Sequence, residues 1–524
     1  MCAKSGAGEE VLNLAEAARF IRVSEKTLRE MARGKRVPCQ KVGREWRFLR
    51  RGLEQWLANP SVGPSSSKAK EDFQQTMLFP GGPAVEDEGD LPGFGDTAFS
   101  NNRHEPLHRW VPWIAGFSSA FVDRVFDKAI SGDPEGVLVL DPFAGVGTTL
   151  VEGLRRGHNV VGFEINPYAA LACEVKLTCA RSGPKPLRET IEKLERWRSG
   201  RGTGEMQPIS TAPHNFRSKT PFFSPSVERQ VLLLRDLIDE EANRFVRDIL
   251  RVALGSVMVG FSNYSYEPSL STRVAAGREE IEFADVMGVF CEKLLEMESD
   301  ISYLRRHIKS LRRKPTSKVH RLSYLNGSDL LSPHSVDVLV TSPPYLNNYH
   351  YVRNTRPQLY WLNLVDGNGD LKQLEEQNFG RFWQTVRGGP PVELSIDVPE
   401  LQDLLKSIRG RNPEKGVYGG GGWANYAAAY FNDCDRFFKV TRRVMKPGGY
   451  VVVVIGNNIV QGVHVETDRI FSQIGESHGF VLEGMHRVRK KRTGSSIINS
   501  SVRAGTAKKR TELYETAVEL RAPN

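Results

Sequence analysis

The chain has 524 residues, more than one domain normally holds, so two or three domains are expected. Its hydrophobic content of 40% and charged content of 26% are those of a globular protein with a sizeable core. The net charge of +10 predicts a polyanionic partner, with nucleic acid first. Apolar runs such as 450–455 are far shorter than the ~20 residues of a membrane span, so we expect no membrane insertion.

The cysteines and the N-terminus indicate a cellular compartment. The six cysteines are scattered without Cys-x-x-Cys pairs, which argues against a disulfide framework or a metal site. The first residues lack the basic-then-apolar order of a signal peptide. Both features favour a reducing cytoplasm.

Residues 9–58 have the pattern of a small helical domain with a wing. An apolar helix from Val11 precedes a turn, Ser24 is suited to cap a second helix, residues 37–48 read as two strands, and a third helix begins at Gly52. The segment resembles the excisionase-like, MerR-related winged helix-turn-helix family. That resemblance implies a double-stranded DNA partner, with major-groove residues Lys26, Thr27, Arg29 and Arg33, and wing residues Arg44 and Arg47. A protein-docking domain is the alternative.

The rest of the chain divides by composition. Residues 59–100 are rich in Pro, Gly, Ser and acid, which is typical of a flexible linker. Residues 101–522 alternate strand-like and helical patterns, which predicts an α/β domain with a mostly parallel sheet. The expected strands are 136–140, 159–164, 320–325, 336–341, 450–455, 480–488 and 512–520. A helical insert of about 180–315 and an irregular insert of about 365–420 interrupt them.

The first strand of this domain runs into a glycine turn, Asp141-Pro-Phe-Ala-Gly-Val-Gly-Thr-Thr149, followed by a helical pattern. Glycines allow the backbone to approach a ligand closely, and the helix offers free N–H groups. A dinucleotide-binding turn is the rival interpretation, but its third glycine is missing. The run resembles motif I of amino-methyltransferases. The resemblance implies a Rossmann-like seven-stranded class I methyltransferase sheet that binds S-adenosylmethionine.

The same resemblance assigns cofactor-binding residues. Glu164, which ends the second strand, would accept both ribose hydroxyls, and Asp329, after the third strand, would contact the adenine amino group. The segment 108–117 resembles the helix that flanks the cofactor, although its aromatic residues fit a core equally well. The remaining cofactor residues are Asp141, Phe143, Ala144, Gly145, Gly147, Thr148 and Asn166.

The fourth strand ends in Ser342-Pro343-Pro344-Tyr345, and two prolines end a sheet ladder and hold the chain extended. An exocyclic base amine is a poor nucleophile, because its lone pair is delocalised into the ring. A fixed carbonyl or the Ser342 hydroxyl can accept its protons, and Tyr345 can stack on a flipped base. A rigid strand exit without chemistry is the alternative.

Thr341-Ser-Pro-Pro-Tyr345 resembles motif IV of DNA amino-methyltransferases. Members with Ser in the first place of Ser-Pro-Pro are mostly cytosine-N4 enzymes, so cytosine-N4 is favoured over adenine-N6. Cytosine-C5 methylation needs a thiol nucleophile just after the fourth strand. The only Pro-Cys pair of the chain is Pro38-Cys39, in the N-terminal domain, so this chemistry is disfavoured.

Between Arg487 and Arg510 the chain has nine basic residues and no acids, which favours a phosphate-gripping loop over a solvated face. The residues assigned to DNA there are Arg489, Lys490, Lys491, Arg492, Lys508 and Lys509. Either insert could recognise the target; the first, with residues 261–266 and Arg273, could equally be a clamp or a dimer surface.

The favoured function is a site-specific DNA methyltransferase of restriction–modification or phage defence, with restriction or defence proteins as partners. An RNA methyltransferase is the more distant enzymatic alternative, and a helix-turn-helix domain argues against it. A transcriptional regulator with an inactive methylase body is the non-enzymatic alternative.

Overall fold

The computed structural model divides the chain into two compact units, residues 1–80 and 81–524. In the first unit it describes residues 11–21, 25, 28, 32, 37, 39–42, 45–49 and 53; in the second, residues 102–113, 116–131, 136–200, 206–266, 270–346, 351–491 and 513–524. The linker expected over 59–100 lies outside these residues.

The N-terminal unit is a small helical domain with a three-stranded sheet. Helix α1 (Leu14–Phe20) begins with a capping box, in which Asn13 and Glu16 each accept the other's backbone N–H. Strands β2 (Gln40–Val42) and β3 (Glu45–Leu49) are the two expected over 37–48, and β1 (Val11–Leu12) pairs with β3 as well. The buried core comprises Leu12, Ala17, Ala18, Leu28, Ala32, Val37, Phe48 and Leu53.

The second unit is built on a seven-stranded sheet in the order β13-β14-β10-β9-β4-β5-β8. The strands are β4 (Leu138–Asp141), β5 (Asn159–Phe163), β8 (Ser317–His320), β9 (Val336–Thr341), β10 (Met445–Gly456), β13 (Val481–Lys491) and β14 (Leu513–Arg521). All pairs are parallel except those of β14, which runs antiparallel to both neighbours. This is the predicted class I methyltransferase sheet. Strand order reverses between β4 and β9, where open parallel sheets bind ligands beyond the carboxyl ends of their strands.

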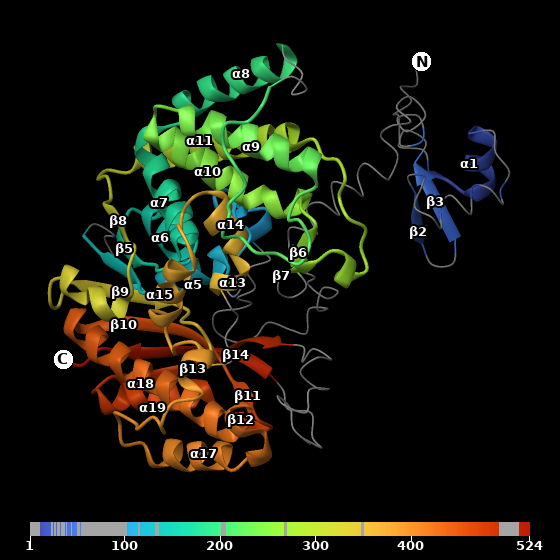
Figure 1. Ribbon diagram of the computed structural model, residues 1–524. Coiled ribbons are helices and arrows are strands. Elements are labelled where there is room, and N and C mark those ends of the chain that lie inside the picture. The colour runs from blue at the N-terminus through green and yellow to red at the C-terminus, as the bar shows by residue number, and fades with distance from the viewer. Residues whose placement is uncertain are drawn as a thin grey trace. The chain divides into compact units, whose positions relative to one another are not determined.

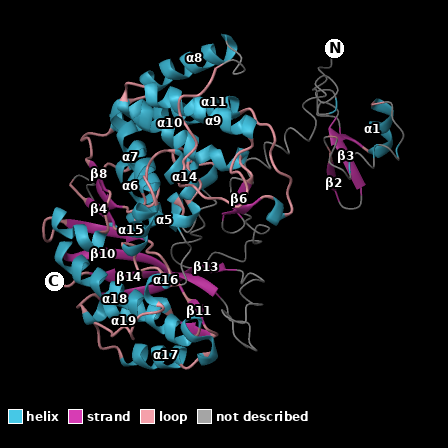
Figure 2. Ribbon diagram, viewed as in Figure 1, coloured by secondary structure: helices cyan, strands magenta, loops and turns pink. Residues whose placement is uncertain are grey.

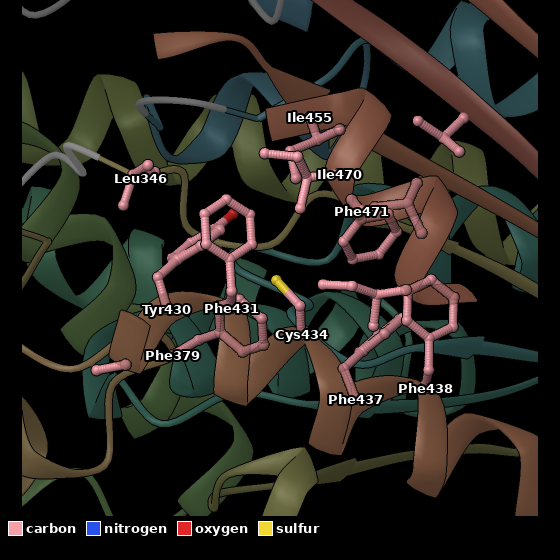
Figure 3. Packing of buried hydrophobic residues seen from close by; sticks show 14 of the residues in the cluster. Leu346, Phe379, Tyr430, Phe431, Cys434, Phe437, Phe438, Ile455, Ile470 and Phe471 are labelled. Atoms are coloured by element: carbon pink, nitrogen blue, oxygen red, sulfur yellow. The ribbon is translucent and has the colours of Figure 1, made fainter. Parts of the chain in front are cut away.

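Helices cover both faces of the sheet (Figures 1 and 2). On one face lie α5 (Ser119–Ala129), α6 (Thr148–Arg155) and α7 (Pro167–Ser182), and α6 packs on Val139 and Val160 through Gly153. On the other lie α12 (Tyr324–Gly327), α18 (Gly420–Val444) and α19 (Thr467–Ser477). Figure 3 shows Phe437 and Phe438 of α18 beside Phe471 of α19. This burial anchors the strand ends that carry the site.

The first insert is helical, as expected. It contains α8 (Lys185–Gly200), α9 (Pro225–Glu240), α10 (Arg244–Val257), η4 (Met258–Phe261), a hairpin of β6 (Tyr264–Tyr266) and β7 (Leu270–Thr272), η5 (Val274–Ala276) and α11 (Val286–Ser310). Its residues 261–266 were candidates for reading bases, but Phe261, Ser262 and Tyr264 are buried and the Tyr266 hydroxyl donates to the Asn354 carbonyl. These side chains therefore form core rather than a DNA-reading surface.

Three sequence expectations need correction. The third strand is β8 at 317–320 rather than 320–325, because the chain turns into α12 at Tyr324. Among the described residues of 108–117, which are 108–113 and 116–117, the only helical turn is η3 (His108–Trp110). The insert at 365–420 is largely helical rather than irregular, since Pro399 and Gly420 each begin a helix. The segment 351–418 contains α13 (Tyr351–Asn354), α14 (Arg356–Trp361), α15 (Asn368–Glu376), α16 (Trp383–Val386), α17 (Pro399–Arg409) and η7 (Pro413–Tyr418).

The remaining observations concern a short strand pair, membrane-spanning helices and metal-binding side chains. A two-stranded ribbon of β11 (Asn458–Val460) and β12 (Val463–Val465) follows β10. Among the residues that the structure describes, none of the helices has the length and apolar character needed to span a membrane. In the same part of the chain, no three His, Cys, Asp or Glu side chains are grouped so that they could hold a metal ion.

Candidate active site

A pocket lies at the carboxyl ends of β4, β5, β8 and β9. Both sequence motifs contribute to it, because Asp141 and Gly145 of the glycine turn and Ser342 and Pro344 of the proline corner line its wall. The two corners therefore open into one shared cavity.

Asp141, the last residue of β4, joins the two motifs directly. Its Oδ1 accepts the Thr341 hydroxyl over 2.5 Å and the Phe143 N–H over 3.0 Å. Asp141 is 2% exposed, and burial raises the pKa of its carboxyl to about 6 against the opposing effect of these hydrogen bonds. The carboxylate is therefore held in one place by one donor from the adjacent strand β9 and one from the turn that follows β4.

Glu164 follows β5 and grips the glycine turn. Its Oε2 accepts the Gly145 N–H over 2.8 Å, and its Oε1 accepts the Asn166 N–H over 2.7 Å. Burial raises the pKa of Glu164 to about 7, and the nearby Asp141 carboxylate adds to the rise. Two acids in one pocket disfavour each other's ionisation and favour a ligand that carries hydroxyl donors or positive charge.

The glycine turn needs glycine at two positions. Gly145 (φ +51°) and Gly147 (φ +88°) have left-handed backbones, which side chains disfavour. A Cβ on Gly147 would lie 2.6 Å from Cys173 Sγ, and one on Gly145 would lie 3.0 Å from Trp113 Nε1. Gly147 caps the N-terminus of α6, so free N–H groups of that helix lie behind the turn. The turn thus brings backbone donors close to the pocket.

The proline corner shapes the opposite wall. Ser342 and Pro344 line the pocket, whereas Pro343 is buried behind them. The Ser342 hydroxyl donates to the Tyr345 hydroxyl over 3.4 Å. The Tyr345 ring lies against Gly456 of β10, where a Cβ would come within 3.2 Å of it. Tyr345 is not among the pocket-lining residues of the described chain, so in this structure it supports Ser342 rather than facing a base.

The predicted cofactor residues mostly lie together. Asp141, Phe143, Ala144, Gly145, Thr148, Glu164 and Asn166 all line the pocket, and Gly147 lies behind it at the cap of α6. Asp329 does not line it: its side chain is 93% exposed and pairs with Arg443 over 3.3 Å. The reason is the early end of β8, which leaves Leu322, Ser323 and Tyr324 at the pocket and carries Asp329 beyond it into η6 (Ser328–Leu330).

Several lining residues were missed from the sequence. Trp113 and Tyr351 have nearly parallel rings with centroids 6.4 Å apart, and both line the pocket. Gln377, Asn378 and Phe379 reach it from the second insert. Phe379 packs edge-on against Phe143 with centroids 5.1 Å apart. Trp113 stood in a segment already singled out, but residues 377–379 carry no local motif that could have marked them.

The residues assigned to DNA are described only in part. Arg47 lies on β3, where its Nη1 donates to the Trp46 carbonyl. Arg489 is exposed on β13, and Lys490 and Lys491 occupy the last positions of that strand. Three assignments in the basic loop and five in the N-terminal unit lie outside the described residues: Arg492, Lys508, Lys509, Lys26, Thr27, Arg29, Arg33 and Arg44.

Most of the chain is similar in sequence to one class of enzymes. The type II methyltransferase M.BsoBI of Geobacillus stearothermophilus is 22% identical over 76% of this chain and 84% of its own length. M.MvaI of Kocuria varians is 25% identical over 74% and 84%, and M.AvaI of a Nostoc strain is 23% identical over 79% and 86%. The chain is a homologue of type II methyltransferases. A shorter match, 48% identity over 82 residues, joins it to the type II methyltransferase M.MjaII of Methanocaldococcus jannaschii.

Two further matches concern domains and fold. Residues 11–61 match the helix-turn-helix domain family, which confirms the class predicted for the N-terminal segment of this methyltransferase homologue. Among solved structures, an rRNA methyltransferase, aviRa from Streptomyces viridochromogenes, superposes with a TM-score of 0.30 and 9% identity, covering 83% of this chain and 96% of that one.

Proposed function

We propose that this protein is a site-specific DNA methyltransferase that moves a methyl group from S-adenosylmethionine to the exocyclic amine of a flipped base, with cytosine N4 as the favoured target. The observation that carries the proposal is the shared pocket, lined by Asp141 and Glu164 on one side and by Ser342 and Pro344 on the other. Similarity to type II methyltransferases over about three-quarters of the chain supports the same conclusion.

The pocket residues fit S-adenosylmethionine. The cofactor has a ribose diol, and Glu164 offers a buried carboxylate to accept its hydroxyls. It also has positive charge on its sulfonium and ammonium groups, which the acidic pair of Asp141 and Glu164 favours. Asn166, Phe143 and the Gly145 backbone would complete its binding. When bound, the cofactor supplies an electrophilic methyl group.

The chain's own contribution to the chemistry is to hold the amine. Ser342 lines the pocket, and its Oγ can accept an N–H, which draws the nitrogen lone pair out of conjugation and towards the methyl group. The prolines at 343 and 344 fix the backbone so that this acceptor does not have to reorganise. With the cofactor bound, the amine nitrogen that Ser342 Oγ holds would form the new N–C bond as the methyl–sulfonium bond breaks, and the amine proton would pass to solvent water.

The choice of base follows from residue 342. Serine is a neutral acceptor and resembles the motif of cytosine-N4 enzymes, whereas adenine-N6 enzymes usually have Asp at this position. Adenine N6 is the second candidate, because the same pocket geometry serves either amine.

DNA is the polymer best suited to the charge of the chain. The basic end of β13 pairs with β14 in a register that places Arg489 opposite Glu515, and Glu515 lies next to the proline corner through Tyr345. Phosphate contacts there would hold a duplex at the mouth of the pocket. The helix-turn-helix domain adds a second DNA contact, and restriction–modification is the proposed context.

One experiment tests the proposal. Purified protein is incubated with methyl-labelled S-adenosylmethionine and duplex DNA, the DNA is digested to nucleosides, and the labelled nucleoside is identified. The expected product is N4-methyldeoxycytidine. N6-methyldeoxyadenosine would instead identify adenine N6, the second candidate, as the target. In a parallel incubation with RNA, label in RNA but not in DNA would indicate an RNA methyltransferase. No label in either polymer would indicate a transcriptional regulator with an inactive methylase body.

A further inference from the structure

A buried carboxylate lies behind the proline corner, on a strand far away in the sequence. Glu515 is the third residue of β14, is 6% exposed, and pairs in register with Gly456 at the end of β10. The Tyr345 ring rests on that same Gly456. The strand pairing therefore brings Glu515 up to the tyrosine, 170 residues away from it along the chain.

The contacts form a chain of three side chains. The Tyr345 hydroxyl hydrogen-bonds the Glu515 carboxylate, and the same hydroxyl receives the Ser342 O–H over 3.4 Å. Burial first, and then the carboxylate, raise the pKa of Tyr345 well above its usual value, so this phenol keeps its proton and can donate it.

The direction of these bonds decides what Ser342 can do. Ser342 is the donor in its bond to the Tyr345 oxygen, so the Tyr345 O–H is the proton that is left to donate to the Glu515 carboxylate. The phenol oxygen is then left to accept, and the Ser342 O–H donates to it. The lone pairs of Ser342 Oγ are consequently free to face the pocket, where an amine N–H would meet an acceptor rather than another donor.

Resting on the proposed function, we infer that Glu515 is a positioning residue, which acts through Tyr345 to hold Ser342 as a hydrogen-bond acceptor for the target amine. Without the carboxylate, the hydroxyl protons of Tyr345 and Ser342 can point in either direction. In a fraction of the enzyme molecules the Ser342 O–H then points at the amine N–H, so that one donor faces another. The role explains a buried acid with no place in cofactor binding.

The test is a double-mutant cycle on methyl transfer. Glu515→Gln keeps the size of the side chain but can donate to Tyr345, and Tyr345→Phe keeps the ring on Gly456 but breaks the chain. In the wild-type background, Glu515→Gln should lower kcat about tenfold. In the Tyr345→Phe background, the same substitution should leave kcat unchanged within about twofold, because the carboxylate no longer reaches Ser342.

Glu519 provides the matched control. It is a carboxylate of the same strand, 1% exposed, with its own partners Lys128, Tyr450 and His486. Glu519→Gln should lower the melting temperature and leave kcat unchanged. For every variant, the dissociation constant of S-adenosylmethionine is measured by equilibrium dialysis, and it should stay within about twofold of wild type for Glu515→Gln.

Equal losses of kcat from Glu515→Gln in both backgrounds would overturn the inference, because a merely structural role is additive. No loss in the wild-type background would overturn it as well. If Glu515→Gln does not fold, the cycle is run with Ser342→Ala and Tyr345→Phe, whose losses should not add. Failure of wild-type protein to methylate DNA would instead refute the proposed function, and the inference with it.

Discussion

Thr341, the last residue of β9, donates its hydroxyl to the Asp141 carboxylate over 2.5 Å and so joins the carboxyl ends of two adjacent parallel strands. One strand leads into the glycine turn and the other into the proline corner. The bond therefore sets the distance between the two halves of the pocket. Four predictions concern this pocket, and a fifth concerns the N-terminal helix-turn-helix domain.

Removing the hydroxyl with Thr341→Val should loosen that connection. Asp141 is buried, so the loss of a donor should cost about 1–3 kcal/mol of unfolding free energy and weaken S-adenosylmethionine binding. Denaturant unfolding and equilibrium dialysis measure the two effects. Thr190→Val, which removes a 3.0 Å bond to Glu241 in the helical insert, should affect stability alone. Unchanged cofactor affinity in Thr341→Val would contradict the connecting role.

Cofactor affinity should depend on pH through Glu164. Because burial raises the pKa of its carboxyl to about 7, the group is neutral below that pH and ionised above it. Only the ionised form accepts two hydroxyls and adds negative charge, so S-adenosylmethionine should bind about fivefold more weakly at pH 6 than at pH 8. Asp141, with its pKa raised to about 6, should add to the loss at the acid end.

The variant Glu164→Gln is the control for this pH dependence. It should bind the cofactor about tenfold more weakly at pH 8, and its affinity should vary less between pH 6 and pH 8. Isothermal titration calorimetry at several pH values measures both. A wild-type affinity that is constant across this range would refute the role of the raised pKa.

The glycine turn should not tolerate Gly147→Ala. The backbone there has φ +88°, and a Cβ would lie 2.6 Å from Cys173 Sγ, so strain and a clash combine. We expect a loss of about 2–4 kcal/mol in unfolding free energy, together with weaker cofactor binding. Gly277→Ala isolates the strain, because that residue has φ +71° and no described atom within 4 Å of its Cβ position. Equal losses at both positions would contradict the clash.

Trp113 should matter for binding and Trp110 for folding. Trp113 is half-buried, lines the pocket and lies over Gly145, so Trp113→Ala should weaken cofactor binding about tenfold with little loss of stability. Trp110 is fully buried and donates to Asp300 over 2.9 Å, so Trp110→Phe should lower the melting temperature instead. Dialysis and thermal unfolding separate the two outcomes, and a reversed pattern would refute the assignment.

Deletion of residues 1–80 should leave the second compact unit folded, since contacts divide the chain at that point. DNA affinity should fall, and its dependence on salt should become less steep, because phosphate contacts from the helix-turn-helix domain are lost. Fluorescence anisotropy at several salt concentrations tests this. Equal affinity and an equal salt slope would remove the domain from DNA binding.

Local patterns determined the parts of the site that depend on near neighbours. Strand β9 begins at Val336 and ends at Thr341, as expected, because an apolar run meets two prolines that cannot continue a ladder. Asp141 and Glu164 were placed at the pocket for a similar reason, since parallel strands meet at their carboxyl ends and a glycine turn follows one of them.

Tertiary structure decided what depends on distant pairing. Asp329 lies outside the pocket because β8 is short: its pairing with β5 begins at Ser317 and ends three residues later. No local signal in the sequence specified this length. The second insert, which has no recognisable motif, contributes three pocket-lining residues, Gln377, Asn378 and Phe379. Glu515 reached Tyr345 only through the register of β14 on β10. Short-range sterics specify where a strand such as β9 ends, because two prolines follow it, whereas the contacts between remote side chains depend on strand order and register, which the whole core settles together.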